Sequence, residues 1–250
     1  MISFVGAGPG DPDLITIKGR QRIESADVII YAGSLVHEGH LAYAKSDAEI
    51  LNSAYMDLDE VLACMVSRHR AGKSVVRLHT GDPSVYGAIR EQMDPLAEAN
   101  IPYEVIPGVS SFSAAAAVLK REYTLPGVSQ TVILTRRAGR TPVPEGESIE
   151  ALAAHKASMA IFLSAGQIEN VARELAQSYA AETPVAVVYR ASWEDERVVC
   201  STVGTIAKDM EGAGIRKHAL ILVGDFLGDR YENSKLYDPG FSTEYRKAKR

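Results

Sequence analysis

Three segments of the chain combine glycine, proline and short polar side chains, which let a backbone approach a small ligand closely. They are Gly6–Pro12, Thr80–Gly87 and Pro107–Ser111. Each follows a short apolar run typical of a buried strand. Open α/β sheets bind ligands outside the carboxyl ends of their strands. We therefore expect these segments to converge on a small-molecule site that holds its ligand largely through backbone groups.

Each segment also has a purely structural interpretation. The first can be a tight strand-to-helix turn without a ligand. Asp82 can form an Asx turn or cap a helix expected from about Tyr86. Ser110 or Ser111 can cap the alanine-rich helix predicted over Ala114–Leu119. The spacing alone leaves both interpretations open.

The first segment does not match two well-known nucleotide motifs. The dinucleotide fingerprint G-x-G-x-x-G needs glycine where Asp11 stands, and Pro9 removes a backbone donor from the loop. The phosphate-binding P-loop needs a lysine and a hydroxyl residue that do not follow here.

Strands that alternate with helices must position these segments in the first half of the chain. A helix is predicted where apolar residues from Leu58 to Val66 form one stripe, and Gly72 ends it. This alternation predicts a parallel sheet with right-handed crossovers. The predicted strands are Ile2–Val5, Asp27–Tyr31, Glu49–Leu51, Ser74–Leu78 and Tyr103–Ile106.

The second half of the chain shows the same alternation with some antiparallel character. A helix is expected from Ile168 to Tyr179. The last two strands before the final one are separated only by Arg190–Arg197, so they can pair as a hairpin. The predicted strands are Thr131–Thr135, Met159–Leu163, Val185–Tyr189, Val198–Thr202 and Ala219–Val223.

These patterns predict an α/β fold of two α/β domains, the N-terminal one with a parallel sheet and the C-terminal one with a mixed sheet. We expect an N-terminal domain over residues 1–119, a linker over 120–130, a C-terminal domain over 131–228 and a polar tail over 229–250. The linker is indicated by its charge and by Pro126-Gly127.

Composition excludes several classes of protein. The formal net charge of −5 argues against a nucleic-acid partner, which calls for clustered basic residues. The two cysteines, Cys64 and Cys200, form no zinc pattern, and we expect no bound metal. No apolar run approaches the ~20 residues that span a bilayer. A soluble, cytoplasmic protein without membrane or nucleic-acid partners is expected.

In combination and order, the three glycine-bearing segments resemble those of the tetrapyrrole (corrin and porphyrin) methylase family. The similarity runs from Ile2 to about Asp225 and includes the helix start Leu14–Gly19. The resemblance implies S-adenosylmethionine as the methyl donor, bound in a cleft between two α/β domains, and S-adenosylhomocysteine as its product. It also implies a homodimer.

Three further segments are similar to those of family members that methylate carbon 11 of precorrin-4 or cobalt-precorrin-4 in cobalamin biosynthesis. They are Tyr31–Val36, Thr135–Pro142 and Val188–Trp193. A C-methyltransferase acting on a small tetrapyrrole is therefore expected. Whether the substrate already carries cobalt stays open at this point.

The resemblance also implies which residues bind the two ligands. Arginines suit the acetate and propionate groups of a tetrapyrrole because their planar forks pair with carboxylates. Lesser candidates for that role are Arg20, Arg77, His79 and Arg190, and Trp193 or Tyr86 can flank a flat ring. The expected substrate-binding residues are Ser34, Arg136, Arg137 and Arg140. The expected donor-binding residues are Pro9, Thr80, Gly81, Asp82, Val85, Ser110, Ser111, Ser164, Ala191 and Leu220.

No catalytic residue is assigned from the sequence. Relatives that methylate uroporphyrinogen place an aspartate directly after the tyrosine equivalent to Tyr31, and here that position is Ala32. An electron-rich carbon of a reduced tetrapyrrole is already nucleophilic, so positioning is the main task expected of the enzyme.

Three alternatives remain open from the sequence. The chain can be another S-adenosylmethionine-dependent corrin or uroporphyrinogen methyltransferase, or a relative acting on diphthamide or ribosomal RNA. It can be a nicotinamide-dependent oxidoreductase, although Asp27 opens its strand instead of ending it. It can also be a non-catalytic nucleotide-binding protein, since a fold does not determine its function.

Overall fold

A computed structural model describes the backbone of residues 1–249; the side chain of Ser34 lies outside the described part. Contacts divide the chain into two compact units. Unit 1 is Met1–Ala114 together with Arg190–Asp195, and unit 2 is Ala115–Tyr189 together with the chain from Glu196 onward. The predicted linker 120–130 lies inside unit 2 of this division, and the predicted domain limits themselves stay a prediction.

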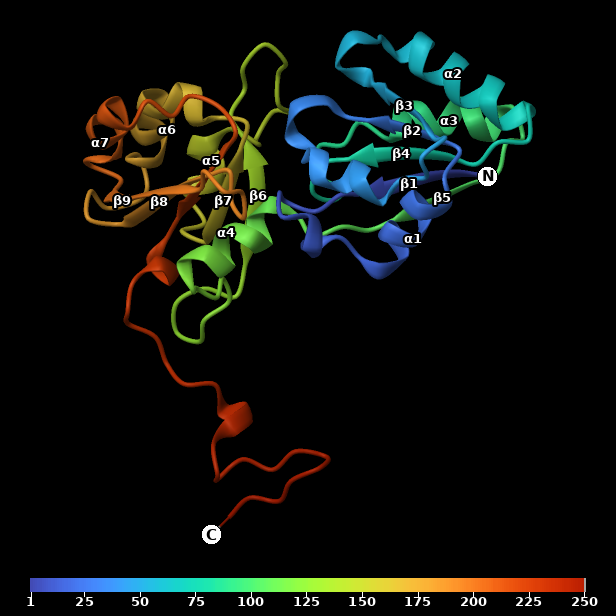
Figure 1. Cartoon of the computed structure of the whole chain (residues 1–250). Helices are drawn as coiled ribbons and strands as arrows, with labels where there is room; N and C mark the ends of the chain where they lie inside the picture. The colour runs from blue at the N-terminus through green and yellow to red at the C-terminus, as the bar shows by residue number, and fades with distance from the viewer. Residues whose placement is uncertain (250) are drawn as a thin grey trace. The chain divides into compact units, whose positions relative to one another are not determined.

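Unit 1 contains a five-stranded, fully parallel sheet with the strand order β3-β2-β4-β1-β5 (Figure 1). Its strands are β1 (Ile2–Gly6), β2 (Val28–Tyr31), β3 (Glu49–Asn52), β4 (Val75–His79) and β5 (Tyr103–Ile106). Its helices are α1 (Ile17–Ser25), α2 (Leu58–Arg70) and α3 (Arg90–Glu98), and α4 (Ser111–Leu119) runs on into unit 2. Short 3₁₀ helices are η1 (Pro12–Leu14), η2 (Gly33–Leu35), η3 (Glu38–Tyr43) and η4 (Ser53–Tyr55).

Local signals in the sequence explain where these helices begin and end. The Thr16 side chain accepts a hydrogen bond from the Gly19 amide and caps α1. Asp57 and Glu60 form a reciprocal capping box at the start of α2. Gly72 follows α2 with φ +80°, a conformation that glycine adopts at little cost.

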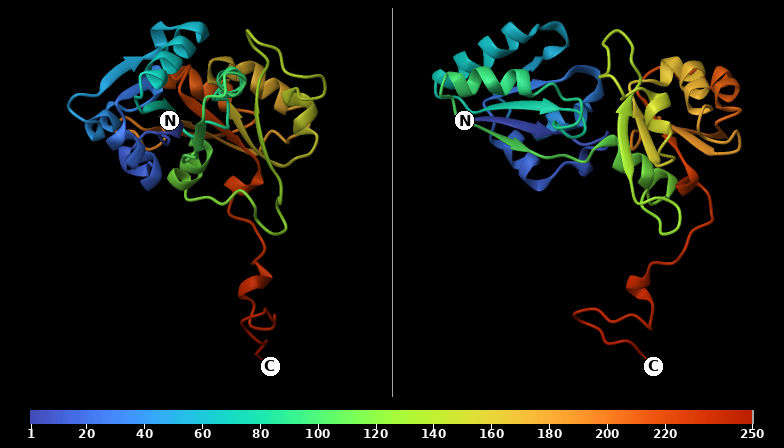
Figure 2. Two further views of the ribbon diagram at one scale, coloured as in Figure 1. Left: turned by 90° about the vertical axis from the view of Figure 1, so that its right-hand side faces the viewer. Right: turned by 180° about the vertical axis from the view of Figure 1, so that it is seen from behind.

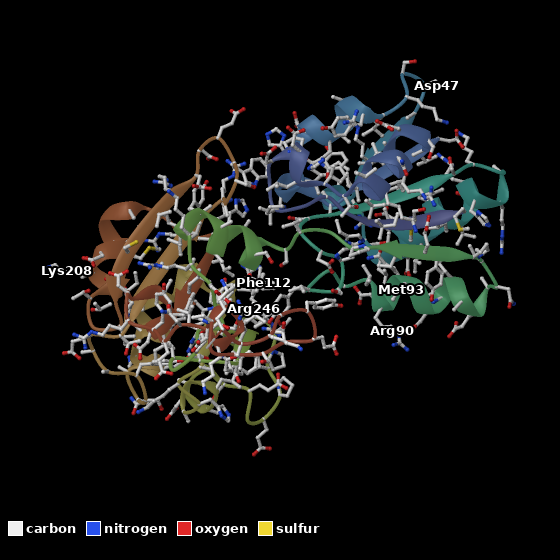
Figure 3. All side chains as sticks on the ribbon, turned by 90° about the horizontal axis from the view of Figure 1, so that it is seen from below. Asp47, Arg90, Met93, Phe112, Lys208 and Arg246 are labelled. Atoms are coloured by element: carbon white, nitrogen blue, oxygen red, sulfur yellow. The ribbon has the colours of Figure 1, made fainter. Side chains whose placement is uncertain are left out.

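Helices cover both faces of the sheet in unit 1 (Figures 1 and 2). One core lies against α2 and α3 and includes Phe4, Met65 and Leu96. A second core lies against α1 on the opposite face and includes Val5 and Ile23. The α3 helix is correspondingly two-sided, because Leu96 is fully buried while Arg90 projects outward (Figure 3).

Unit 2 contains a five-stranded mixed sheet with the order β6-β7-β10-β8-β9. Only β6 and β7 are parallel; the other neighbours are antiparallel, and β8 and β9 form the predicted hairpin. Its strands are β6 (Val132–Arg136), β7 (Ser158–Phe162), β8 (Pro184–Tyr189), β9 (Arg197–Thr202) and β10 (Ala219–Val223). Its helices are α5 (Ile149–Ala153), α6 (Ile168–Leu175) and α7 (Ile206–Ala213), with η5 (Ala165–Gln167), η6 (Asp225–Leu227) and η7 (Lys235–Tyr237).

The core of unit 2 is apolar and continuous. Side chains of α5, α6 and α7, among them Ile149, Leu175 and Met210, pack against Ile161 and Ile221 of the sheet. The two-domain α/β fold with one parallel and one mixed sheet is confirmed. None of the helices in the described part of the chain has the length and apolar character required to cross a membrane.

One predicted helix begins later than expected. The sequence favoured a helix from about Tyr86, but α3 begins at Arg90. Tyr86 and Ala88 have φ values of 57° and 49°, in the left-handed region, which interrupts any right-handed helix there. Residues 83–86 form turns instead.

Candidate functional site

The three glycine-bearing loops meet at the carboxyl edge of the parallel sheet. The Gly8 amide donates to the Gly81 carbonyl at 3.2 Å, and the Gly81 amide donates back to the Gly8 carbonyl at 2.8 Å. The Gly108 amide of the third loop donates to Asp82 Oδ2 at 2.8 Å. The predicted convergence of the three loops is confirmed.

Glycine is required where these loops touch. A Cβ atom built on Gly108 would lie 2.2 Å from the Gly81 carbonyl oxygen, so no larger residue fits there without moving backbone. Gly81 itself has φ +60°, which other residues rarely adopt. The loops therefore stack backbone against backbone at the sheet edge.

The carboxylate of Asp82 braces this arrangement. Its Oδ1 accepts the Ser84 amide at 2.8 Å and also the Ser84 hydroxyl, and its Oδ2 accepts the Gly108 amide. Burial acts to raise the pKa of Asp82, but these hydrogen bonds outweigh it and hold the pKa below its usual value. Asp82 is thus ionised at neutral pH and forms the Asx turn that its sequence context allowed.

The other donor-site candidates of unit 1 lie around these loops. Pro9, Gly81, Ser110 and Ala191 are buried, whereas the remaining candidates are half-buried. Ser110 precedes α4, and its carbonyl accepts the Ser113 and Ala114 amides. The half-buried candidates are Thr80, Asp82, Val85 and Ser111. These positions carry short side chains close to the backbone contacts between the loops.

The segment Arg190–Asp195 is fastened to the first loop. Trp193 Nε1 donates to the Pro9 carbonyl at 2.9 Å, and the Asp11 amide donates to Ser192 Oγ at 3.1 Å. The indole also lies 4.8 Å from the His37 ring, measured between centroids. Trp193 thus holds the loop that contains Pro9 through a side-chain hydrogen bond.

Two donor-site candidates belong to unit 2. Ser164 is fully buried, and its hydroxyl donates to the Phe162 carbonyl at 2.6 Å and accepts the Arg137 amide at 2.9 Å. Leu220 lies on β10 opposite Val188 and is also buried. Ser164 therefore has a structural task of its own, and its place in a donor site stays a prediction.

The three arginines expected to bind substrate differ in their surroundings. Arg136 donates to the carbonyls of Thr141 and Pro142, which shapes the loop after β6. Arg137 forms an ion pair with Glu174 at 2.7 Å and a hydrogen bond with Gln167. Arg140 is exposed. Ser34 belongs to η2, and nothing is described of its side chain.

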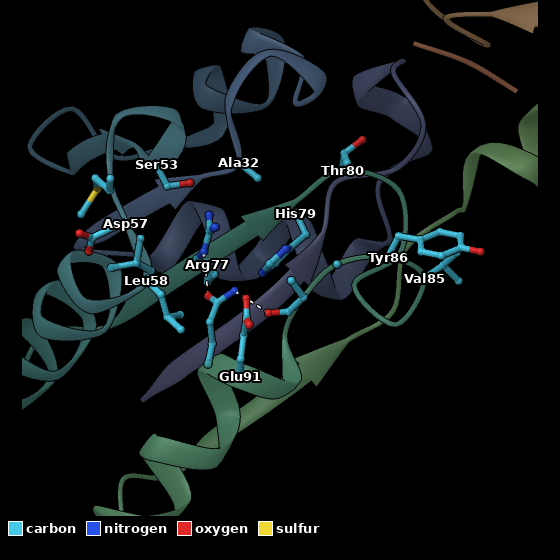
Figure 4. A pocket seen from close by; sticks show the side chains of 15 residues that line it. Ala32, Ser53, Asp57, Leu58, Arg77, His79, Thr80, Val85, Tyr86 and Glu91 are labelled. Carbon is cyan, nitrogen blue, oxygen red and sulfur yellow. Dashed lines mark hydrogen bonds between the residues drawn. The ribbon is translucent and has the colours of Figure 1, made fainter. Parts of the chain in front are cut away.

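A pocket of about 280 Å³ lies in unit 1 above the end of β4 (Figure 4). Arg77 and His79, two residues apart on β4, lie on the same side of the sheet and line it. Arg77 Nε donates to Gln92 Oε1 at 3.1 Å, and its Nη1 donates to the Ile30 carbonyl at 3.2 Å. Ala32 also lines this pocket.

Sequence reasoning named Arg77 and His79 only as lesser candidates and did not name Gln92. The sequence did contain an indication of this pocket. Arg77 and His79 alternate with apolar residues inside the strand Val75–His79. Such a pattern places both on one face of a strand whose residues are all buried. Burial lowers the pKa of Arg77 to about 10, and burial beside Arg77 lowers the pKa of His79 to about 3.

The part of the chain that the structure describes contains no group of three or more His, Cys, Asp or Glu side chains arranged to hold a metal ion. Cys64 and Cys200 are both free thiols.

Comparison with known proteins relates the whole chain to curated enzymes. The chain is 58% identical over 249 residues to the cobalt-precorrin-4 C(11)-methyltransferase of Methanocaldococcus jannaschii, covering 99% of this chain and 96% of that protein. It is 47% identical to the precorrin-4 C(11)-methyltransferase of Pseudomonas aeruginosa, covering 96% of this chain and 99% of that protein.

Solved structures agree with these relatives. A cobalt precorrin-4 methyltransferase matches with a TM-score of 0.89 and 48% identity, over 91% of this chain and 96% of that one. The uroporphyrin-III C-methyltransferase of Thermus thermophilus, complexed with S-adenyl homocysteine, matches with a TM-score of 0.76 and 28% identity, over 90% and 98%. The pattern of the Tetrapyrrole (Corrin/Porphyrin) Methylases matches residues 1–207, and the chain belongs to this family.

Proposed function

We propose that this protein transfers a methyl group from S-adenosylmethionine to carbon 11 of precorrin-4 or cobalt-precorrin-4 in cobalamin biosynthesis. The observation that carries the proposal is the 58% identity over 249 residues to a curated cobalt-precorrin-4 C(11)-methyltransferase. The three converging loops at the sheet edge supply a backbone-lined surface of the kind such a donor needs.

The donor site is assigned to the residues that the family resemblance selects. In unit 1 the backbone of the loops would hold the donor, with Asp82 keeping two loops together. The proposed contacts are Pro9, Thr80, Gly81, Asp82, Val85, Ser110, Ser111 and Ala191 from unit 1, with Ser164 and Leu220 from unit 2. Support comes from the close backbone contact between Gly81 and Gly108, where a Cβ atom on Gly108 would lie 2.2 Å from the Gly81 carbonyl oxygen.

The chemistry requires positioning above all. When bound, S-adenosylmethionine supplies an electrophilic methyl group whose C–S bond breaks as the substrate carbon forms its new C–C bond. The protein's part is to hold a nucleophilic carbon in line with that bond, and correct placement is worth several kcal/mol of barrier. Ala32, which lines the pocket, carries no acid–base group, and the proposal assigns no side chain to proton transfer.

The substrate side of the proposal includes Arg140 on the exposed loop after β6, together with Ser34, Arg136 and Arg137. The guanidinium of Arg137 is already paired with Glu174, so Arg140 is the arginine of the three with the most freedom to meet a carboxylate. A homodimer and a cytoplasmic location complete the proposal; light scattering and cell fractionation test them.

Incubation with methyl-labelled S-adenosylmethionine and either metal-free or cobalt-containing precorrin-4 tests the function. Mass analysis of the product should show one added methyl group, and fragmentation should place it on carbon 11. The preferred substrate decides between the two forms. If neither form is methylated while calorimetry shows that S-adenosylhomocysteine still binds, this reaction is excluded. The result would then favour a different methyltransferase activity of the same family.

Calorimetry with NADH separates the oxidoreductase alternative. We expect S-adenosylhomocysteine to bind and NADH to give no heat, because Asp11 and Pro9 break the dinucleotide fingerprint. The opposite pattern would remove the methyl-transfer proposal.

A further inference from the structure

The pocket above β4 contains a buried cation without a counter-ion. Arg77 is 7% exposed, burial lowers its pKa, and it forms no ion pair with any residue that the structure describes. The described residues provide acceptors for its Nε and Nη1, in Gln92 and Ile30, but none for Nη2. A buried guanidinium in this state is costly unless an anion meets it.

His79 adds an unsatisfied polar atom beside this cation. It is 3% exposed, and its Nε2 has no hydrogen-bond partner among the described residues. Burial and the charge of Arg77 keep the imidazole neutral at physiological pH. The pocket floor therefore carries one positive charge and one neutral imidazole, both short of partners.

The shape of the pocket limits what can enter. Its volume of about 280 Å³ lies just below the lower limit of the ~300–1,000 Å³ that is typical of sites enclosing a whole small molecule. A tetrapyrrole ring does not fit inside it, whereas one carboxylate-bearing side arm does. The walls add apolar surface from Leu58 and Val61, which suits the methylene groups of such an arm.

The rim of the pocket is built with unusual backbone geometry. Tyr86 and Ala88 both lie in the left-handed region, and Gly87 between them cannot carry a Cβ atom, which would lie 2.1 Å from the Pro83 carbonyl oxygen. Non-glycine residues in this region are energetically costly and persist only where the surrounding structure holds them. They cluster at active sites and ligand sites. All three residues line the pocket.

We propose that Arg77 and His79 form a carboxylate pocket that receives one acetate or propionate arm of the tetrapyrrole substrate. The Arg77 guanidinium pairs with the carboxylate through its unpartnered Nη2, and the neutral His79 contributes a hydrogen bond. This inference rests on the proposed function, since it names how that substrate is held.

The test compares substrate binding with donor binding in the Arg77→Gln variant. KM and kcat with precorrin-4 report on the substrate, and calorimetry with S-adenosylhomocysteine reports on the donor site. Removing a buried charge partner should raise KM by about tenfold or more, with donor affinity changed by less than about twofold. Arg77→Lys keeps the charge but loses the fork, and an intermediate KM is expected. Arg90→Gln, on exposed α3, is the matched control and should behave as the wild type.

A second variant keeps the test decisive if Arg77→Gln does not fold. Leu58→Glu places a negative charge at the pocket mouth, at the first position of α2, where an acidic residue suits the helix dipole. It should raise KM for precorrin-4 and leave donor affinity intact.

Three outcomes are distinguishable. Unchanged KM in folded Arg77→Gln and in Leu58→Glu would overturn the carboxylate pocket. A parallel fall in S-adenosylhomocysteine affinity would assign the pocket to the carboxylate of the donor and also overturn it. Absence of turnover in the wild type would instead be a failure of the proposed function.

Discussion

The carboxylate of Asp82 accepts the Gly108 amide at 2.8 Å and so joins the loop after β4 to the loop after β5. The same carboxylate accepts the Ser84 amide within its own loop. One side chain thus stabilises the turn that follows β4 and fixes its position against the neighbouring loop. The glycine-lined edge proposed to hold the methyl donor depends on this contact.

Replacement of Asp82 by alanine should weaken donor binding by about tenfold or more, because it leaves the partly buried Gly108 amide unpaired. Calorimetry with S-adenosylhomocysteine measures this. Ser84→Ala is the matched control, since it removes a single hydroxyl donor to Asp82 and keeps the tie to Gly108. Equal affinity in Asp82→Ala and wild type would remove Asp82 from the site.

Trp193→Phe should loosen the first loop. The change removes the hydrogen bond from Nε1 to the Pro9 carbonyl and costs about 1 kcal/mol of unfolding free energy. Donor affinity should fall as well, because Pro9 is a proposed contact. Denaturant unfolding and calorimetry measure the two effects, with Tyr55→Phe, at an 88% exposed position, as the control. A variant with wild-type values in both would show that the tie has no role in the loop.

Arg137 and Arg140 should separate stability from substrate binding. Arg137→Ala breaks the ion pair with Glu174 and the bond to Gln167, at a cost of about 1–2 kcal/mol, since both charged side chains are largely covered. Arg140→Ala should leave unfolding unchanged and raise KM for the tetrapyrrole. Denaturant melts and steady-state kinetics on both variants decide. The reverse pattern would make Arg137, instead of Arg140, the stronger substrate contact of the two.

Acid should destabilise the protein through His40. This side chain is fully buried, and neither ring nitrogen has a partner among the described residues. Burial, helped by His37 and opposed by Asp11, lowers its pKa from 6.5 to about 4. The unfolded chain therefore binds a proton between these values while the folded chain does not. Stability contributed by neutral His40 is complete above pH 6.5 and falls as pH drops toward 4, by up to about 1.4 kcal/mol per pH unit.

His40→Leu provides the check, because leucine fills a similar volume without titrating. Its unfolding free energy should fall less steeply than that of the wild type between pH 6.5 and pH 4.5. His155→Leu, at an exposed position, serves as the control. Parallel pH profiles for His40→Leu and wild type would contradict the assignment.

The fold was predictable because its signals are local. Short buried strands such as Val28–Tyr31, helix caps such as Thr16 and Asp57, and the closely spaced β8 and β9 all depend on residues near in sequence. The late start of α3 was not predicted, since the left-handed conformations of Tyr86 and Ala88 carry no mark in their residue types.

The sequence by itself determined the family, the order of strands and helices, and the three loops that face one sheet edge, because strand polarity places carboxyl ends together. Only the tertiary structure decided which polar groups are already satisfied. Arg137 and Ser164 are engaged within unit 2, while Arg77 is buried and forms no ion pair with the residues described by the structure. Partners such as Glu174 lie far along the chain from the residues whose charge they neutralise. Whether a charged side chain has a partner in the folded protein therefore depends on tertiary packing.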